Sequence, residues 1–207
     1  MPFRFLDALF GRDKLPQAKP DKLFALVTAI VTIQEALGWE PAGRAGLCLK
    51  PLLGGDFDRT RQEIEELMRL GAAETQSEVQ VVSDELGYLW VIIADPQLDD
   101  EVNLIHLSTQ TLLEQGYGPQ LLAAVFRFRL QDTGGSARPS TAKGADTFRG
   151  YWIFNYKRGN FYPFVPLSEQ AKTRDHEPEL RAAALLTREL PVEQDQTRWF
   201  ALWNCPV

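Results

Sequence analysis

Cysteine and histidine are scarce in the sequence: Cys48 and Cys205 are the two cysteines, and His106 and His176 are the two histidines. Two cysteines this far apart do not make the disulfide framework of a small secreted protein, so the composition favours a reducing compartment. A zinc site needs several such ligands at close spacing. We therefore expect no metal site, and no motif indicates a cofactor.

Long hydrophobic runs are also missing. The longest spans residues 23–33, about half of the roughly 20 apolar residues with which a helix crosses a bilayer. The N-terminus lacks the small-residue cleavage site of a signal peptide, and Asp7 interrupts its apolar stretch. We therefore expect a cytoplasmic protein.

Positive charge is in deficit, with a formal net charge of −6 and an isoelectric point of about 5.1. Such a chain has no overall basic field to attract nucleic acid, so we expect no nucleic-acid partner. No glycine-rich phosphate loop follows a strand pattern, which disfavours a dinucleotide-binding fold.

The chain does contain a regular succession of helix and strand patterns. Apolar residues at helical spacing, with caps and glycine stops, predict helices over residues 21–37, 58–70, 96–115 and 178–190. β-branched and aromatic runs predict strands over 46–53, 79–82, 88–94, 121–130 and two within 151–164. This order predicts an α+β fold in which helices pack on an antiparallel sheet.

Further details concern particular segments. Residues 21–207 are expected to form a single domain, with a flexible loop at 131–147 that is rich in Gly, Ser, Thr and Ala. The first helix is apolar nearly all round, which predicts a central, buried position. Gly71 is expected to follow the end of the second helix. The aromatic C-terminal tail is expected to pack on the body.

The hairpin at 151–164 is the most informative stretch because its aromatic residues fall on both faces. Such a strand must be covered twice or meet a partner, and Pro163 predicts a sheet edge or a bulge. One interpretation is an edge hairpin that closes the core. The other is a protein- or anion-binding tip that combines rings with two cations. The candidate partner-binding residues are Tyr117, Tyr156, Lys157, Arg158, Gly159, Phe161, Tyr162 and Phe164.

Residues 1–20 read as an amphipathic arm and linker. Aromatic and leucine side chains on a short basic helix suit the inner face of the cell membrane, and equally a partner or the body of the protein itself. The candidate membrane-contact residues are Phe3, Arg4, Phe5, Leu6, Leu9, Phe10 and Arg12.

No catalytic constellation can be identified. His106 lies within a helix pattern and is expected to be hydrogen-bonded, whereas His176 stands in a charged, exposed helix start. Cys48 is expected to be buried in a strand, and Cys205 has no histidine near it in sequence. We therefore name no catalytic residue and expect a protein that is not an enzyme.

Four segments together resemble the PspA-associated protein PspAB family: FLDALFGR (5–12), GYGPQLL (116–122), YKRGNFYPF (156–164) and LPVEQDQTRWFALW (190–203). Residues 131–147 depart from the family, which has a short connection there. The resemblance implies a bacterial cytoplasmic protein linked with PspA-type membrane-stress systems, and no enzymatic activity is established for such proteins. The order of elements is also similar to the type III secretion chaperone and YbjN-like arrangement, an analogy of fold that confers no function by itself.

Two hypotheses of different classes follow. The first is a non-enzymatic adaptor or regulator that binds a protein partner through its sheet and hairpin. The second is a small-molecule-binding protein or hydrolase, with Lys157 and Arg158 beside a phosphate or carboxylate and a pocket lined by His106 or Cys205. A homodimer through an exposed sheet edge is compatible with either.

Overall fold

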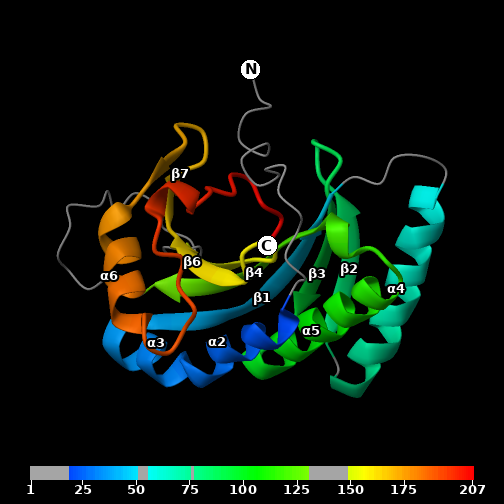
Figure 1. Ribbon diagram of the computed structural model, residues 1–207, viewed down its shortest axis with the longest axis horizontal. Coiled ribbons are helices and arrows are strands. Elements are labelled where there is room, and N and C mark those ends of the chain that lie inside the picture. The colour runs from blue at the N-terminus through cyan, green and yellow to red at the C-terminus, as the bar shows by residue number, and fades with distance from the viewer. Residues whose placement is uncertain (1–18, 51–55, 76, 131–148) are drawn as a thin grey trace, which may run out of the picture.

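The computed structural model describes residues 19–50, 56–75, 77–130 and 149–207, without the side chains of 56–60 and 73–75. The expected arm and the expected loop at 131–147 lie outside the described residues, apart from Lys19 and Pro20. The described chain forms a six-stranded sheet in the order β2-β3-β1-β4-β5-β6, antiparallel at every pairing. Helices α2, α3 and α5 lie along one face, and the C-terminal segment crosses the other (Figure 1). The predicted α+β class with an antiparallel sheet is confirmed.

The main elements have the following bounds. The strands of the large sheet are β1 Trp39–Leu49, β2 Glu78–Ser83, β3 Leu89–Ala94, β4 Leu121–Leu130, β5 Arg149–Asn155 and β6 Asn160–Phe164. A second, two-stranded sheet consists of β7 Pro166–Ser168 and β8 Thr173–Arg174. The helices are α2 Ala25–Thr28, α3 Ile30–Leu37, α4 Asp56–Thr75, α5 Leu98–Glu114 and α6 His176–Leu186, with 3-10 turns η1 Pro20–Phe24, η2 Gly118–Gln120 and η3 Gln196–Arg198.

Both faces of the sheet are covered, which explains the aromatic residues on both faces of the hairpin. On the helix side, Phe154 pairs with Phe161 across β5 and β6, and both side chains are fully buried. On the opposite side, Ile153 pairs with Tyr162, and these side chains are also buried. A side chain on either face of this hairpin therefore has a hydrophobic environment within the same molecule.

The first helix differs from the expectation of all-round burial. It runs through η1, α2 and α3 and ends at Gly38, whose φ of 66° is the left-handed conformation of a helix C-cap. Leu23, Leu26 and Ile33 are fully buried, but Val31 is 64% exposed. The prediction of a central helix is wrong, because the sheet covers one side of this helix and solvent the other.

Two other boundaries differ from the sequence patterns. Helix α4 continues through Gly71 to Thr75 instead of ending there. A Cβ at Gly71 would lie 3.0 Å from Leu107 Cδ2 of α5, so this glycine permits a close helix–helix approach. Strand β1 begins at Trp39, well before the expected residue 46, and takes up Pro41 through an irregularity between Pro41 and Ala45.

The C-terminal tail packs on the body, as expected. Val207 is buried and its side chain occupies the space that a Cβ at Gly46 would need. The ring of Trp203 meets Phe164 edge-on at 5.1 Å between centroids. The tail thus forms the cover of the sheet face that the helices leave open.

Arg174 fixes the start of this tail. Its guanidinium donates to the Glu179 carboxylate at 2.9 Å, to the Trp199 carbonyl at 2.7 Å and to the Pro163 carbonyl at 3.3 Å. Glu179 is fully buried and also accepts from the Val165 main-chain N–H at 2.7 Å. A single side chain therefore ties β6, α6 and the tail together.

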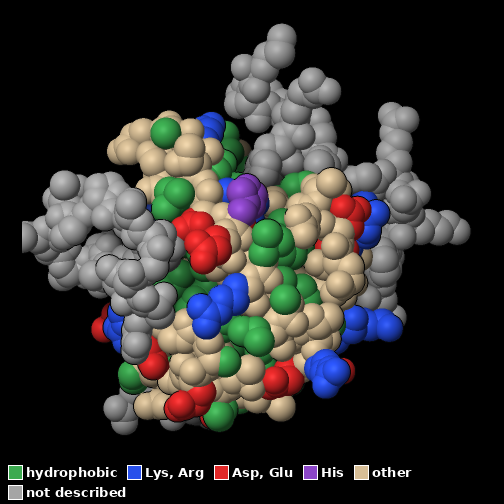
Figure 2. Space-filling model, turned by 90° about the vertical axis from the view of Figure 1, so that its left-hand side faces the viewer, with side chains coloured by type: hydrophobic (Ala, Val, Ile, Leu, Met, Phe, Trp, Pro, Cys, Tyr) green, Lys and Arg blue, Asp and Glu red, His purple; other side chains and the backbone are tan. Residues whose placement is uncertain are grey.

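The side of the molecule that carries α6 and β7 mixes scattered hydrophobic side chains with charges of both signs (Figure 2).

Candidate interaction site

The four hairpin rings that we considered as partner contacts lie in the core. Tyr156, Phe161, Tyr162 and Phe164 are each at most 2% exposed. The Tyr156 hydroxyl and the Thr109 hydroxyl of α5 lie 2.6 Å apart, within hydrogen-bond distance, and burial raises the pKa of Tyr156. These rings fix the hairpin to the helix layer and offer no surface to a partner. Of the two interpretations of the hairpin, the burial of these rings agrees with the edge hairpin that closes the core, because the helices and the tail cover both of its faces.

The turn between β5 and β6 presents the polar part of the hairpin. Arg158 is exposed and Lys157 is half-buried. Gly159 has a φ of 67° and its N–H donates to the Asn155 carbonyl at 2.7 Å. Lys22 of η1 donates from Nζ to the Gly159 carbonyl at 2.9 Å. The turn is therefore held by contacts to its own strand and to the first helical segment.

Cations from three separate segments gather at this turn. Burial lowers the pKa of the Lys50 ammonium, and the charge of Lys157 lowers it further, so these two lysines lie within electrostatic reach of each other. Arg158 lies 3.8 Å from the Glu193 carboxylate. We call Lys22, Lys50, Lys157 and Arg158 the turn site. Glu193 offsets part of the Arg158 charge, so the attraction for anionic groups at this turn comes mainly from Lys22, Lys50 and Lys157.

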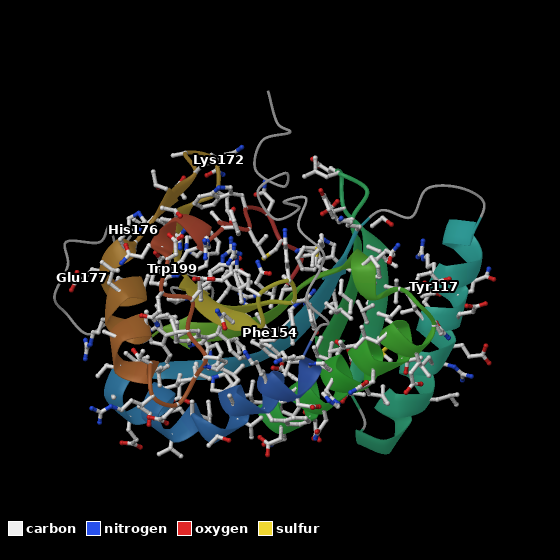
Figure 3. All side chains as sticks on the ribbon, viewed as in Figure 1. Tyr117, Phe154, Lys172, His176, Glu177 and Trp199 are labelled. Carbon is white, nitrogen blue, oxygen red and sulfur yellow. The ribbon has the colours of Figure 1, made fainter. Side chains whose placement is uncertain are left out.

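Three of the segments that carry the family resemblance meet around the turn site. The Tyr156 N–H donates to the Leu122 carbonyl at 3.2 Å, and the Lys50 N–H donates to the Gln120 carbonyl at 2.8 Å. Segment 116–122 is thereby joined to the hairpin and to the end of β1. Tyr117, the remaining candidate contact, lies in the turn before β4 and is half-buried (Figure 3).

The outer side of β6 is joined to the segment 190–203. The Phe161 N–H donates to the Pro191 carbonyl and the Phe161 carbonyl accepts from the Glu193 N–H, both at 2.8 Å. Phe161 and Val192 form an isolated parallel bridge. Strand β6 is the last in the sheet order, as Pro163 predicted, and this segment covers its edge.

A family model decides the relationship: the model described as PspA associated protein B matches residues 3–207. The chain belongs to this family. No curated protein and no solved structure matches it. The type III secretion chaperone and YbjN-like arrangement therefore stays a prediction. None of the helices in the described part of this PspAB chain is long and apolar enough to cross a membrane.

The histidines of this PspAB chain occupy the places that the sequence suggested. His106 Nε2 lies 3.1 Å from the Asp21 carboxylate, and its ring packs on Phe24 at 4.9 Å between centroids. The His176 side chain is 68% exposed and lies 3.2 Å from Glu179. Each histidine thus has a carboxylate partner within the described part of the chain.

The two thiols lie on the tail side of the sheet. Burial raises the pKa of both Cys48 and Cys205, which keeps the thiols protonated and weakly nucleophilic. Among the residues that the structure describes, no group of three or more His, Cys, Asp or Glu side chains is placed to hold a metal ion.

Sequence reasoning found the turn residues Lys157, Arg158 and Gly159 but missed Lys22 and Lys50. These lysines are more than a hundred residues from the turn in sequence and belong to no local motif. They reach the turn through the antiparallel packing of β1, β4 and β5 and through the position of η1. The dipeptide Lys157-Arg158 was therefore the one signal in the sequence for this site.

Proposed function

We propose that this protein is a non-enzymatic, cytoplasmic adaptor or regulator of a PspA-type membrane-stress response, and that it binds an acidic surface of its protein partner at the turn site. The family name associates such proteins with PspA. The gathering of Lys22, Lys50, Lys157 and Arg158 at one turn is the observation that carries the choice of surface.

The turn site has the properties of a preorganised contact. Its backbone rests on buried rings, and Lys22 fixes the Gly159 carbonyl at 2.9 Å. Little conformational entropy is then lost when a partner binds the turn, compared with a free loop. The positive charges of the turn site repel one another in the free protein. A carboxylate-rich partner relieves this repulsion, so its electrostatic binding energy is larger than at an isolated charge.

A charge-reversal pair tests the proposal. Lys157→Glu removes one cation of the turn site, and Lys172→Glu makes the same change in the connection between β7 and β8, away from Phe154 of the hairpin (Figure 3). Binding to the purified PspA-type protein of the same genome is measured by isothermal titration calorimetry. We expect Lys157→Glu to weaken binding by roughly tenfold, since reversing one surface charge near opposite charges changes the binding energy by about 1–2 kcal/mol.

The control separates a local effect from a change of net charge. Lys172→Glu should leave the affinity within about twofold, and both variants should melt within a few degrees of the parent. Equal affinities for the two variants would remove the turn site from the proposal. An absence of binding by the parent protein would remove the PspA-type partner itself.

Peripheral membrane contact through the arm belongs to the same proposal as a second attachment. Its support is the pattern of Phe3, Phe5, Leu6, Leu9 and Phe10 beside Arg4 and Arg12. Deletion of residues 1–14 should lower the fraction that sediments with anionic liposomes. An unchanged fraction would end this part of the proposal.

A further inference from the structure

Strand β2 is the opposite, outermost strand of the sheet, and its main-chain groups alternate between β3 and the outside. The Asp84 N–H donates to the Tyr88 carbonyl at 3.0 Å, which makes this pair hydrogen-bonded. Hydrogen-bonded pairs then recur at every second residue of an antiparallel ladder. The main-chain groups of residues 78, 80 and 82 therefore face β3, and those of Val79, Val81 and Ser83 face away from it.

A side-chain contact agrees with this assignment. Arg61 of α4 donates from Nη2 to the Val81 carbonyl at 3.2 Å. The Val81 carbonyl thus points to the outside of the sheet, as the alternation requires. Nε of the same guanidinium also donates to Glu65 at 2.8 Å. One outward carbonyl of the edge is covered by a side chain, and in the part of the chain that the structure describes no strand lies beyond β2.

A groove runs between this edge and α4. It has a volume of about 690 Å³ and is lined by Arg61, Glu65 and Arg69 of α4 and by Val79, Gln80 and Val81 of β2. Arg61, Glu65 and Arg69 follow one another at four-residue intervals, so they share one stripe of the helix. The groove therefore combines outward main-chain donors and acceptors on one wall with two guanidinium groups on the other.

We propose that the β2 edge binds an extended segment of a partner protein as a seventh strand, with an acidic side chain of that segment at Arg61 and Arg69. Adding a strand to a free edge satisfies main-chain groups that a flat surface contact leaves in water. The incoming strand replaces Arg61 on the Val81 carbonyl. The guanidinium of Arg69 is exposed, and together with the displaced Arg61 it outweighs Glu65, which favours a carboxylate in the segment.

Charge argues against a second copy of this chain as the occupant. Antiparallel pairing of two β2 strands about Val81 would place Glu78 of one copy opposite Asp84 of the other. A second copy would displace Arg61 from the Val81 carbonyl, as any incoming strand does, but its own β2 strand has no carboxylate opposite Val81 to meet the displaced guanidinium. Like charges directly opposite one another destabilise such a pair. The proposal is independent of the turn site.

The test uses a soluble synthetic peptide, acetyl-Thr-Val-Asp-Val-Thr-Lys-amide, and a matched peptide with Asn in place of Asp. Binding is followed by the amide cross-peaks of the full-length protein in nitrogen-15 NMR spectra. We expect the cross-peaks of Val79, Val81 and Ser83 to shift in a saturable manner. The Asn peptide should bind at least threefold more weakly.

Two variants and a control make the result specific. Val79→Pro removes an outward N–H while keeping the β2–β3 ladder, so it should abolish the shifts. Arg69→Gln should lower the affinity for the Asp peptide to that for the Asn peptide. Arg188→Gln, which changes an exposed arginine after α6, should leave the affinity unchanged. If Val79→Pro fails to fold, the location of the shifts in the parent protein and the peptide affinity of Arg69→Gln still test the proposal.

Three results would overturn the proposal. The first is the absence of shifts at millimolar peptide, and the second is shifts that map away from β2. The third is a dimer, detected by light scattering, in which the β2 amides are protected from hydrogen exchange without peptide. A second copy of the chain would then occupy the edge.

Discussion

The buried carboxyl of Glu101 predicts how the stability of this protein depends on pH. It lies in the first turn of α5 and is fully buried, and its two carboxylate oxygens have no hydrogen-bond partner. Burial raises its pKa from 4.5 to about 9, and the charge of Asp95 contributes in the same direction. A helix N-terminus favours a carboxylate by about 0.3–1 kcal/mol, so desolvation is the larger effect. Glu101 is therefore protonated in the folded protein at neutral pH.

The sign of the resulting pH dependence follows from proton uptake. Between the ordinary pKa of 4.5 and the folded pKa of about 9, the folded chain keeps a proton that the unfolded chain releases. Stability must then fall as the pH rises through this window, with a slope of about 1.4 kcal/mol per pH unit. At pH 7 the accumulated loss is about 3 kcal/mol, a large part of the ~5–15 kcal/mol that stabilises a typical domain.

Glu101→Gln removes the ionisation and keeps the shape of the side chain. We expect the variant and the parent to have similar free energies of unfolding at pH 5, and the variant to be more stable by about 3 kcal/mol at pH 7. Urea unfolding at pH 5, 6, 7 and 8, followed by tryptophan fluorescence, measures this difference. Groups that titrate equally in both proteins cancel in the comparison.

The matched control is Glu114→Gln at the exposed end of the same helix. It should change the free energy of unfolding by less than about 0.5 kcal/mol at every pH, as exposed substitutions usually do. If the parent and Glu101→Gln have parallel pH profiles, Glu101 is not held protonated and the reasoning is wrong.

Two further predictions concern the tail. Arg174→Met leaves the Glu179 carboxylate buried without its guanidinium and should lower the free energy of unfolding by about 3–5 kcal/mol in chemical denaturation; a loss below about 1 kcal/mol would contradict the assigned role of Arg174. Gly46→Ala places a methyl group where Val207 lies and should cost about 1–3 kcal/mol. The same variant should speed proteolysis of the tail after Trp199, and unchanged protection would mean that Val207 does not require this glycine.

Much of the fold could be predicted from the sequence because local patterns specify its elements. The run 121–130 forms β4 with the predicted bounds, and the hairpin strands form on either side of the turn at 156–159. Helix α5 buries Leu98, Val102, Ile105, Thr109 and Leu112, the face that helical spacing defines. In each case the periodicity of apolar residues along a short stretch carries the information.

The remaining features depend on contacts that no local pattern contains. Gly71 resembles a helix stop, yet its neighbour across space, Leu107, makes it a packing residue. Val31 belongs to an apolar run but faces solvent, because only one layer of sheet covers that helix. Lys22 and Lys50 reach the turn site through tertiary packing alone. The sequence therefore predicted two residues of the turn site, Lys157 and Arg158, and missed the two lysines that tertiary packing brings there.

The central position of β1 in the sheet has a consequence for the folding of this protein during its synthesis. Within the described residues β1 is the first strand to be synthesised, yet its neighbours β3 and β4 end at residues 94 and 130. The groups that cover the far side of the sheet follow only with Trp199 and Val207. A nascent chain therefore exposes apolar strands until residues 199–207 have been synthesised, and we expect chaperones to bind it during this interval.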